Sequence, residues 1–248
     1  MNVVLIRVGI DSGSGGTQGP IFKDGSFEFV PIPENKQRDP GKLTYRTARG
    51  PVTKKPLSEF VPARLHDRKI HDDPEWRTFT YGDPNNLKRR LRLLESGDLV
   101  AFYCGLHESS PGGNHEWPPR KNPPLYLIGY FEVEIAGLLS ELRSKLSNPI
   151  IEEYFGENFH VKYRKGIDDP NELVLVKGNP NSRLLKRAVC ISQPAEDRAG
   201  KPTKVLSDEM RKHHFGDLKG RLNITRSGPR WVTDSHVEKA AKFLRGLK

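Results

Sequence analysis

The chain has 248 residues, of which 35% are hydrophobic, and it contains 23 glycines and 20 prolines. This length fits one large domain or two small ones, and so many helix breakers exclude an all-helical protein. No apolar run approaches the roughly 18 residues of a membrane-spanning helix, and residues 1–7 lack the basic start and the apolar length of a signal peptide. We therefore expect a cytoplasmic protein.

The formal net charge of +10 is unevenly placed along the chain. Residues 183–248 hold 16 Lys and Arg against 7 Asp and Glu, whereas residues 1–182 hold 25 against 24. A basic surface confined to one segment is typical of phosphate binding, although a basic surface can also serve solubility alone. We predict that the partner is a nucleic acid, DNA or RNA and possibly modified, and not a membrane; the oligomeric state stays open.

The first part of the chain is predicted to start with a buried strand, because residues 3–10 are rich in β-branched side chains. A loop dense in glycine and small hydroxyl residues follows at 11–19. A β-hairpin over residues 21–30 comes next, with its turn at Asp24 and Gly25.

The middle of the chain combines a helix with a strand–loop–strand unit. Asp83, Pro84 and Asn85 are predicted to open a helix that places three leucines on one buried face, namely Leu87, Leu91 and Leu94. Strands at 99–106 and 125–134 enclose a long polar loop. Cys104 and Cys190 both lie in apolar runs, which predicts two buried free thiols and no disulfide framework.

The last part alternates helices and strands. Residues 136–146 and 150–155 are predicted helices, and residues 172–178 and 188–192 are predicted strands with a basic segment between them. Residues 234–247 form a basic amphipathic helix whose inward face consists of Val237, Ala240, Ala241 and Leu244.

One family resemblance rests on the strand–loop–strand unit. A turn at Gly97 and Asp98 leads into the strand at 99–106, and an Ile-Gly-aromatic segment at 128–130 lies in the returning strand. Here the chain resembles the PUA-like superfamily, which includes the EVE, YTH and ASCH domains. The resemblance implies a mixed α/β fold of the α+β class, with a PUA-like β-barrel, flanking helices and a β-hairpin N-terminal extension. We expect one domain over 1–248, with a PUA-like core within about 1–192 and the basic portion 193–248 packed on it.

A second resemblance rests on short N-terminal segments, at residues 9–13, 19–22, 24–29 and 31–34. These segments are similar to the nucleotide modification associated domain of the third described type, and the similarity extends through residues 229–231. The resemblance implies a link to modified bases in nucleic acid rather than a particular reaction.

The loop at 11–19 is a candidate ligand site, because closely spaced glycines let backbone amides approach an anion. No Gly-Lys-Ser/Thr follows it, so it is not a P-loop, and the hairpin that follows excludes a dinucleotide-binding fingerprint. Asp11 and Ser12 are candidate catalytic residues, and Ser14 and Thr17 are candidate nucleic-acid contacts. The alternative is a flexible surface loop.

Aromatic and basic side chains supply the other candidate contacts. A site for a flipped base needs flat side chains for stacking and polar groups for the base edge. Tyr103, Trp117 and Trp231 are the candidate stacking residues, although Tyr103 also fits a core position. The polar candidates are His115, Arg226, Ser227 and Arg230, which suit base-edge or phosphate contacts.

The sequence does not predict a metal or another cofactor. His107, Glu108, His115 and Glu116 have the His-x-Glu spacing of zinc deaminases, but the Pro-Cys-x-x-Cys partner of that motif is absent.

Three functions are compatible with these features. The first, which we favour, is a nucleic-acid-binding protein that recognises a modified or flipped base in a PUA-like pocket. The second is an enzyme on modified nucleotides, a hydrolase, glycosylase or nuclease, that uses Asp11 with Ser12 or His115. The third is a protein–protein module of a modification or restriction system.

Overall fold

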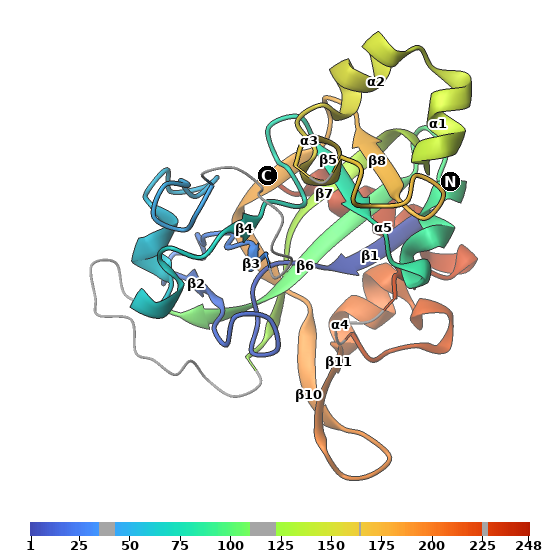
Figure 1. Ribbon diagram of the computed structural model, residues 1–248. Helices are drawn as coiled ribbons and strands as arrows, with labels where there is room; N and C mark the ends of the chain where they lie inside the picture. Colours follow the sequence, from blue (N-terminus) through green and yellow to red (C-terminus); the bar gives the residue numbers. More distant parts are fainter. Residues whose placement is uncertain (35–42, 110–122, 164, 225–227) are drawn as a thin grey trace.

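The computed structural model describes residues 1–34, 43–109, 123–163, 165–224 and 228–248 (Figure 1). Within these residues eight strands form one mixed sheet. Six follow the hydrogen-bonded order β12-β1-β6-β7-β8-β5, while β2 pairs with β6 and β9 pairs with β7. The strands are β1 Val3–Arg7, β2 Gly19–Ile21, β5 Thr80–Asp83, β6 Leu99–Glu108, β7 Leu125–Leu138, β8 Val174–Gly178, β9 Arg183–Cys190 and β12 Arg230–Trp231.

The long strands β6 and β7 form the centre of this sheet. β6 pairs antiparallel with β7, and along its other edge it pairs parallel with β1 and then with β2. Every residue of β6 except Glu108 is buried. A strand that is covered on both faces has a continuous apolar run instead of an alternating one, which is the pattern of residues 99–106. The two predicted central strands are confirmed and extend further, to Glu108 and Leu138.

The sheet is branched rather than closed. The outer edge of β7 pairs with β9 along its first half and with β8 along its second half. The end strands β12 and β5 do not pair with each other in the part of the chain that is described. The mixed α+β class is confirmed, but the predicted closed PUA-like barrel is not found among these strands.

Helices surround the sheet, and none of those described is long and apolar enough to span a membrane. The α-helices are α1 Leu139–Lys145, α2 Asn148–Phe155, α3 Phe159–Lys162, α4 Asp208–Met210 and α5 Val237–Gly246. The 3-10 helices are η1 Leu57–Phe60, η2 Ala63–Leu65, η3 Asn86–Leu93, η5 Leu218–Gly220 and η6 Asp234–His236, and η4 Arg211–Phe215 is a π-helix.

The helix expected after Asp83 is η3, and its winding changes one prediction. Leu91 and Leu94 are buried as expected, but Leu87 is 64% exposed. A 3-10 helix has three residues per turn, so Leu91 and Leu94 share a side while Leu87, four residues before Leu91, is rotated by about 120°. The prediction for Leu87 was wrong because it assumed α-helical periodicity.

Smaller differences concern the ends of elements. The turn at Asp24 and Gly25 forms as predicted, with Ser26 N–H donating to Asp24 Oδ1 at 3.0 Å, but only a single bridge, Ile21 to Phe27, joins the two arms. The predicted helix at 136–146 begins at 139, because β7 continues through 138. Cys104 is buried as expected, whereas Cys190 is exposed at the end of β9.

Two short antiparallel pairs lie outside the main sheet. β3 (Ile32–Pro33) pairs with β4 (Ile70–His71) and places Ile32 opposite His71. β10 (Ser192–Glu196) and β11 (Pro202–Leu206) form a ribbon that projects from the body in Figure 1.

Three groups of buried side chains hold these elements together. The main core covers the sheet and includes the predicted inward face of α5: Val237, Ala240, Ala241 and Leu244. A second core surrounds Tyr45 and includes Ile70, the first residue of β4. A third core forms where α1 and α2 pack on β8 around Leu175. The segment 71–82 follows Ile70 of the second core and contributes Trp76 and Tyr81 to the main core.

Candidate functional site

The predicted catalytic residue Asp11 stabilises its own loop. Its Oδ1 accepts hydrogen bonds from the N–H groups of Gly13 at 3.0 Å and Ser14 at 2.8 Å. Its Oδ2 lies 3.5 Å from the guanidinium of Arg7, and its backbone carbonyl accepts from Gly16 N–H. The amides that could have bound an anion are therefore directed at Asp11 itself, which is 6% exposed.

The hydroxyl residues of this loop do not converge on one point. Ser12 is exposed, Ser14 is half-buried, and Thr17 is completely buried. The loop is an Asp-capped turn in which the Asp11 carboxylate has a structural role, and the catalytic role of Asp11 and Ser12 stays a prediction.

The aromatic candidates separate in the structure. Tyr103 lies in β6, 1% exposed, between β1 and β7, so its ring is not available to a ligand in this conformation. Trp231 lies at the molecular surface in β12 and is half-buried. Four other candidates lie outside the described residues, namely His115, Trp117, Arg226 and Ser227.

Trp231 lines an open groove of about 720 Å³, which we call the C-terminal groove. β12 pairs with β1, opposite Val4, and this pairing anchors the tryptophan. Residues of η3 and η5 also line the groove. The residues that matter below are Leu87, Arg90, Lys219, Arg221, Arg230 and Trp231.

The arginines of this groove differ in their surroundings. Arg230 is 7% exposed and donates to the carbonyl oxygens of Asn223 at 2.7 Å and Gly228 at 2.9 Å. Burial, with the nearby charge of Arg221, lowers the pKa of Arg230, against the opposing effect of Tyr103. Arg90 and Arg221 are exposed, and the Arg90 guanidinium lies 5.1 Å from the centre of the Trp231 ring.

The backbone of η5 is strained where it forms the groove. Leu218 and Lys219 have φ values of 48° and 51°, in the left-handed region that non-glycine residues rarely adopt. The Leu218 side chain is 1% exposed and belongs to the main core, which holds this conformation in place. The turn thereby leaves Lys219 exposed, 3.2 Å from Asp234.

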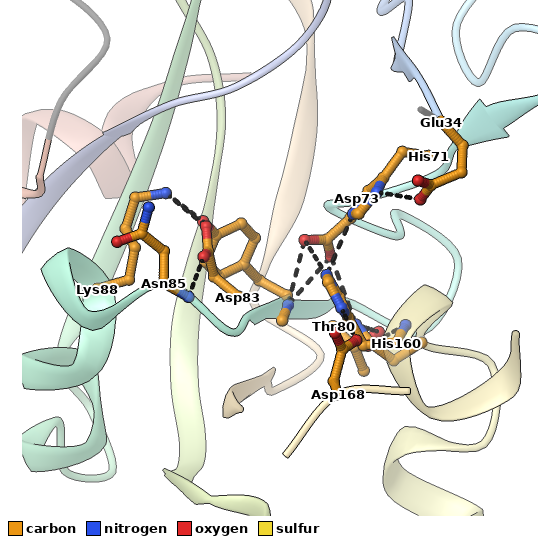
Figure 2. Close-up of polar contacts among 12 residues, drawn as sticks. Glu34, His71, Asp73, Thr80, Asp83, Asn85, Lys88, His160 and Asp168 are labelled. Atoms are coloured by element: carbon orange, nitrogen blue, oxygen red, sulfur yellow. Dashed lines mark hydrogen bonds and ion pairs between the residues drawn. The ribbon is translucent and has the colours of Figure 1, made fainter. Parts of the chain in front are cut away.

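A second constellation, which the sequence did not reveal, is buried between the second and third cores. We call it the histidine cluster: Glu34, His71, Asp73, His160 and Asp168 (Figure 2). The side chains of Asp73 and His160 are 4% and 2% exposed, and that of His71 is 15% exposed. Glu34 directly follows β3, His71 ends β4, Asp73 follows β4, and His160 lies in α3.

The imidazoles of this cluster face each other. His71 Nε2 lies 3.1 Å from His160 Nε2. On the outer side, His71 Nδ1 lies 3.1 Å from Glu34 Oε2 and His160 Nδ1 lies 2.7 Å from Asp168 Oδ2. His160 Nε2 is also 4.0 Å from Asp73 Oδ2. One ligand atom from each of His71, Asp73 and His160 lies within 4.8 Å of the other two, close enough to hold a metal ion.

Asp73 is positioned by distant segments. Gly82 N–H lies 3.1 Å from Asp73 Oδ1, and the Asn158 amide lies 3.4 Å from the same oxygen. A Cβ on Gly82 would lie 2.9 Å from both Asn158 Oδ1 and His160 Cδ2, so the close approach of β5 requires glycine. Burial raises the pKa of Asp73 well above its ordinary value, against the Gly82 hydrogen bond and with a further raising effect of Asp83.

Asp83 ends β5 on the opposite side of the strand from the cluster's imidazoles (Figure 2). Its carboxylate accepts from Lys88 Nζ at 2.8 Å, Tyr81 hydroxyl at 3.0 Å and Asn85 N–H at 2.8 Å. Burial acts to raise the pKa of Asp83, but the charge of Lys88 and these hydrogen bonds outweigh burial and lower it. This network connects β5 to η3, and η3 carries Arg90 of the C-terminal groove.

A weak sequence signal for the histidine cluster did exist. His71 and Asp73 have a His-x-Asp spacing directly before a proline, but nothing in the sequence links them to His160, which lies 89 residues after His71. The histidines with metal-ligand spacing in the sequence were His107 and His115 instead. His107 is buried in β6, and His115 lies outside the described residues.

Comparison with known proteins identifies the family. The chain matches the family described as nucleotide modification associated domain 3 over residues 2–243, nearly its whole length. The chain belongs to this family, so the resemblance in its N-terminal segments is confirmed, and its function is associated with nucleotide modification. The searches of curated proteins and of solved structures gave no significant match.

Proposed function

We propose that the protein binds nucleic acid through the C-terminal groove and recognises a modified or flipped base there. The observation that carries this proposal is the Arg90 guanidinium placed 5.1 Å from the Trp231 ring centre, inside a groove that also presents the exposed Arg221 and Lys219. The family membership supports a nucleic-acid partner, because its description concerns nucleotide modification.

Phosphate contacts follow from the exposed cations. Lys219 lies in η5 and Arg221 directly follows it. Arg90 comes from η3, which also lines the groove. Each phosphate that a cation neutralises releases a counterion, so binding should weaken as the salt concentration rises. Arg230 has a different role in this proposal, because its guanidinium is buried against two carbonyl groups and stabilises the wall of the groove.

Base recognition follows from the flat side chains. Bases stack on indole rings and on guanidinium planes alike, and both surfaces are present in the Arg90–Trp231 pair. Stacking of this kind needs a base that is unpaired or flipped out of its duplex. We therefore expect tighter binding to single strands, or to duplexes with a weakened base pair, than to an intact duplex.

Fluorescence anisotropy with labelled oligonucleotides tests the proposal. Trp231→Ala should weaken binding by about 1–3 kcal/mol, the usual value of one stacked base. Arg221→Ala should weaken binding less and should reduce the slope of log K against log salt by about 0.7 for a single strand. Arg90→Lys keeps the charge but removes the plane, so it should weaken stacking with little change in the salt slope.

The matched control is Arg46→Ala, which removes one exposed arginine whose partner is Asp67, far from the groove. Because Trp231 also contacts the main core, circular dichroism must show that Trp231→Ala is folded. If this variant is unfolded, the variants of the exposed Arg90 and Arg221 test the proposal instead. If Arg221→Ala and Arg90→Lys bind like Arg46→Ala, the groove is not the binding surface.

Recognition of a modified base needs a separate comparison. Oligonucleotides of one sequence, with methylated, hydroxymethylated or unmodified bases, would compete for the wild-type protein and for Trp231→Ala. We expect at least one modification to bind more tightly to the wild type, and this preference to disappear in the variant. Equal competition by every oligonucleotide would leave general nucleic-acid binding but would refute recognition of a modification.

A further inference from the structure

We propose that His71, Asp73 and His160 bind a divalent first-row transition-metal ion, with Glu34 and Asp168 orienting the two imidazoles. This site is separate from the C-terminal groove and does not depend on the nucleic-acid proposal. It would join the β4 segment to α3, two parts of the chain that lie about 90 residues apart.

The first argument comes from the protons of the imidazoles. An ionised carboxylate only accepts hydrogen bonds, so an imidazole nitrogen that bonds to it carries the proton. His71 Nδ1 and His160 Nδ1 lie at hydrogen-bond distance from Glu34 and Asp168. Each neutral imidazole then presents a lone pair at Nε2, and these two atoms are 3.1 Å apart. Two facing lone pairs repel each other unless a proton or a metal ion lies between them, so this pair of nitrogens is suited to hold a cation.

The second argument is the spacing of the ligand atoms. Two nitrogen ligands that each lie ~2.05 Å from Zn²⁺ at a tetrahedral angle are about 3.3 Å apart. The observed 3.1 Å between the Nε2 atoms is close to this value. Asp73 Oδ2 lies 4.0 Å from His160 Nε2, and the three ligand atoms lie within 4.8 Å of one another. The carboxylate would therefore need to approach by roughly 0.7–1.5 Å to complete three ligands. Gly82 N–H lies 3.1 Å from Oδ1 and 3.3 Å from Oδ2, and the Asn158 amide contacts Oδ1. Oδ2 is the carboxylate oxygen that lies toward His160.

The third argument is the outer shell. Histidines that bind metal commonly donate their second ring N–H to a carboxylate, which fixes the tautomer and the ring orientation. Both histidines of the cluster have such a carboxylate, and His71 is also held by the ring of Phe159, whose centre lies 4.1 Å away. Two imidazoles and one carboxylate suit zinc or ferrous iron, whereas magnesium and calcium prefer oxygen ligands alone.

A surface hollow of about 1030 Å³ lies beside the cluster and is lined by His160 and Asp168 together with Lys162 and Lys165. Three protein ligands leave a fourth position for water or for another ligand.

Metal titration of the full chain, with any affinity tag removed and after dialysis against a chelator, tests the site. We expect one Zn²⁺ per chain by calorimetry and a rise in Tm of about 5–10 °C at a Zn²⁺ concentration about 100 times Kd. Co²⁺ should give the visible absorption of a tetrahedral site, and Mg²⁺ at the same concentration should not change Tm. Anaerobic titration with Fe²⁺ distinguishes the two favoured metals by their relative affinities.

Variants then connect the binding to these residues. Asp73→Asn keeps the acceptor for Gly82 N–H but removes the anionic ligand, and His160→Ala removes one imidazole, so both should lose the Tm rise. Asp168→Asn and Glu34→Gln should weaken Zn²⁺ binding by about 10–100-fold. His213→Ala removes an exposed histidine of η4 and is the matched control for adventitious binding.

Two results would overturn the proposal. One is a wild-type protein whose Tm and heat of titration do not respond to any of these metals, which would leave a histidine pair that shares a proton. The other is Zn²⁺ binding that survives in Asp73→Asn or is lost in His213→Ala. If His160→Ala does not fold, the Zn²⁺ response of Asp73→Asn tests the proposal, because this variant keeps an acceptor for Gly82 N–H of β5.

Discussion

Two buried carboxylates, Asp11 and Asp73, have opposite kinds of environment. The hydrogen-bond partners of the Asp11 carboxylate lie two and three residues further along the chain, and its ion-pair partner Arg7 lies four residues before it. The Asp73 carboxylate is contacted by Gly82, Asn158 and His160, which lie between 9 and 87 residues away.

This difference separates a structural carboxylate from a candidate functional one. Local backbone amides satisfy Asp11, and the dense glycines of its loop serve to bring those amides within reach. Asp73 lies among imidazoles from separate elements, where burial raises its pKa and its ionised form needs paired or coordinating groups. A glycine-rich loop after a strand is conspicuous in the sequence, whereas the clustered imidazoles and carboxylates of the histidine cluster lie elsewhere in the fold.

Among the variants that test this comparison, Gly82→Ala should lose the most stability. A Cβ there would press on the Asn158 and His160 side chains at 2.9 Å and on Leu175 at 3.1 Å. We expect a loss of about 2–3 kcal/mol in the free energy of unfolding, measured in urea, together with a loss of the Zn²⁺ response. Gly246→Ala, where a Cβ meets nothing within 4 Å, is the control. Equal stability of the two variants would show that the Asn158 and His160 side chains can move aside without cost.

A smaller effect should follow from changes at Asp11. Asp11→Ala removes the acceptor of two backbone amides and should cost about 1–2 kcal/mol of unfolding free energy. Asp11→Asn keeps an oxygen at the same place and should recover most of this loss, whereas Asp73→Asn should not recover metal binding. Ser12→Ala, at an exposed position, should be neutral. If Asp11→Asn were as destabilised as Asp11→Ala, the charge of Asp11 rather than its hydrogen bonds would matter.

The smallest effect concerns Asp83, a local carboxylate on the same strand as Gly82. Its lowered pKa means that the folded protein favours the ionised form, so this stabilisation is complete above the ordinary pKa of 3.8 and is lost as the pH falls through the lowered value. Asp83→Asn should cost on the order of 1 kcal/mol at pH 7. The difference from the wild type in urea unfolding should shrink below about pH 4. A difference that is independent of pH would show that the Asp83–Lys88 pair does not contribute through its charge.

Much of the fold was predictable because it depends on local patterns. The continuous apolar runs predicted the central strands β6 and β7, and the spacing of Val237, Ala240, Ala241 and Leu244 predicted the buried face of α5. The N-terminal segments predicted the family, and the basic composition of residues 183–248 pointed to the segment that holds Trp231 and Arg221. In each case the information lies within a short stretch of chain, where side-chain periodicity and charge can be read directly.

Only the tertiary structure decided which polar residues share a site. It buried Arg230 and Tyr103, directed Asp11 to its own loop, and wound η3 so that Leu87 faces outward. It also brought His71 and Asp73 to His160, through the pairing of β3 with β4 and the close passage of Gly82 beneath α3. No window of sequence contains the contact between His71 and His160, because it is set by the packing of segments that lie far apart along the chain.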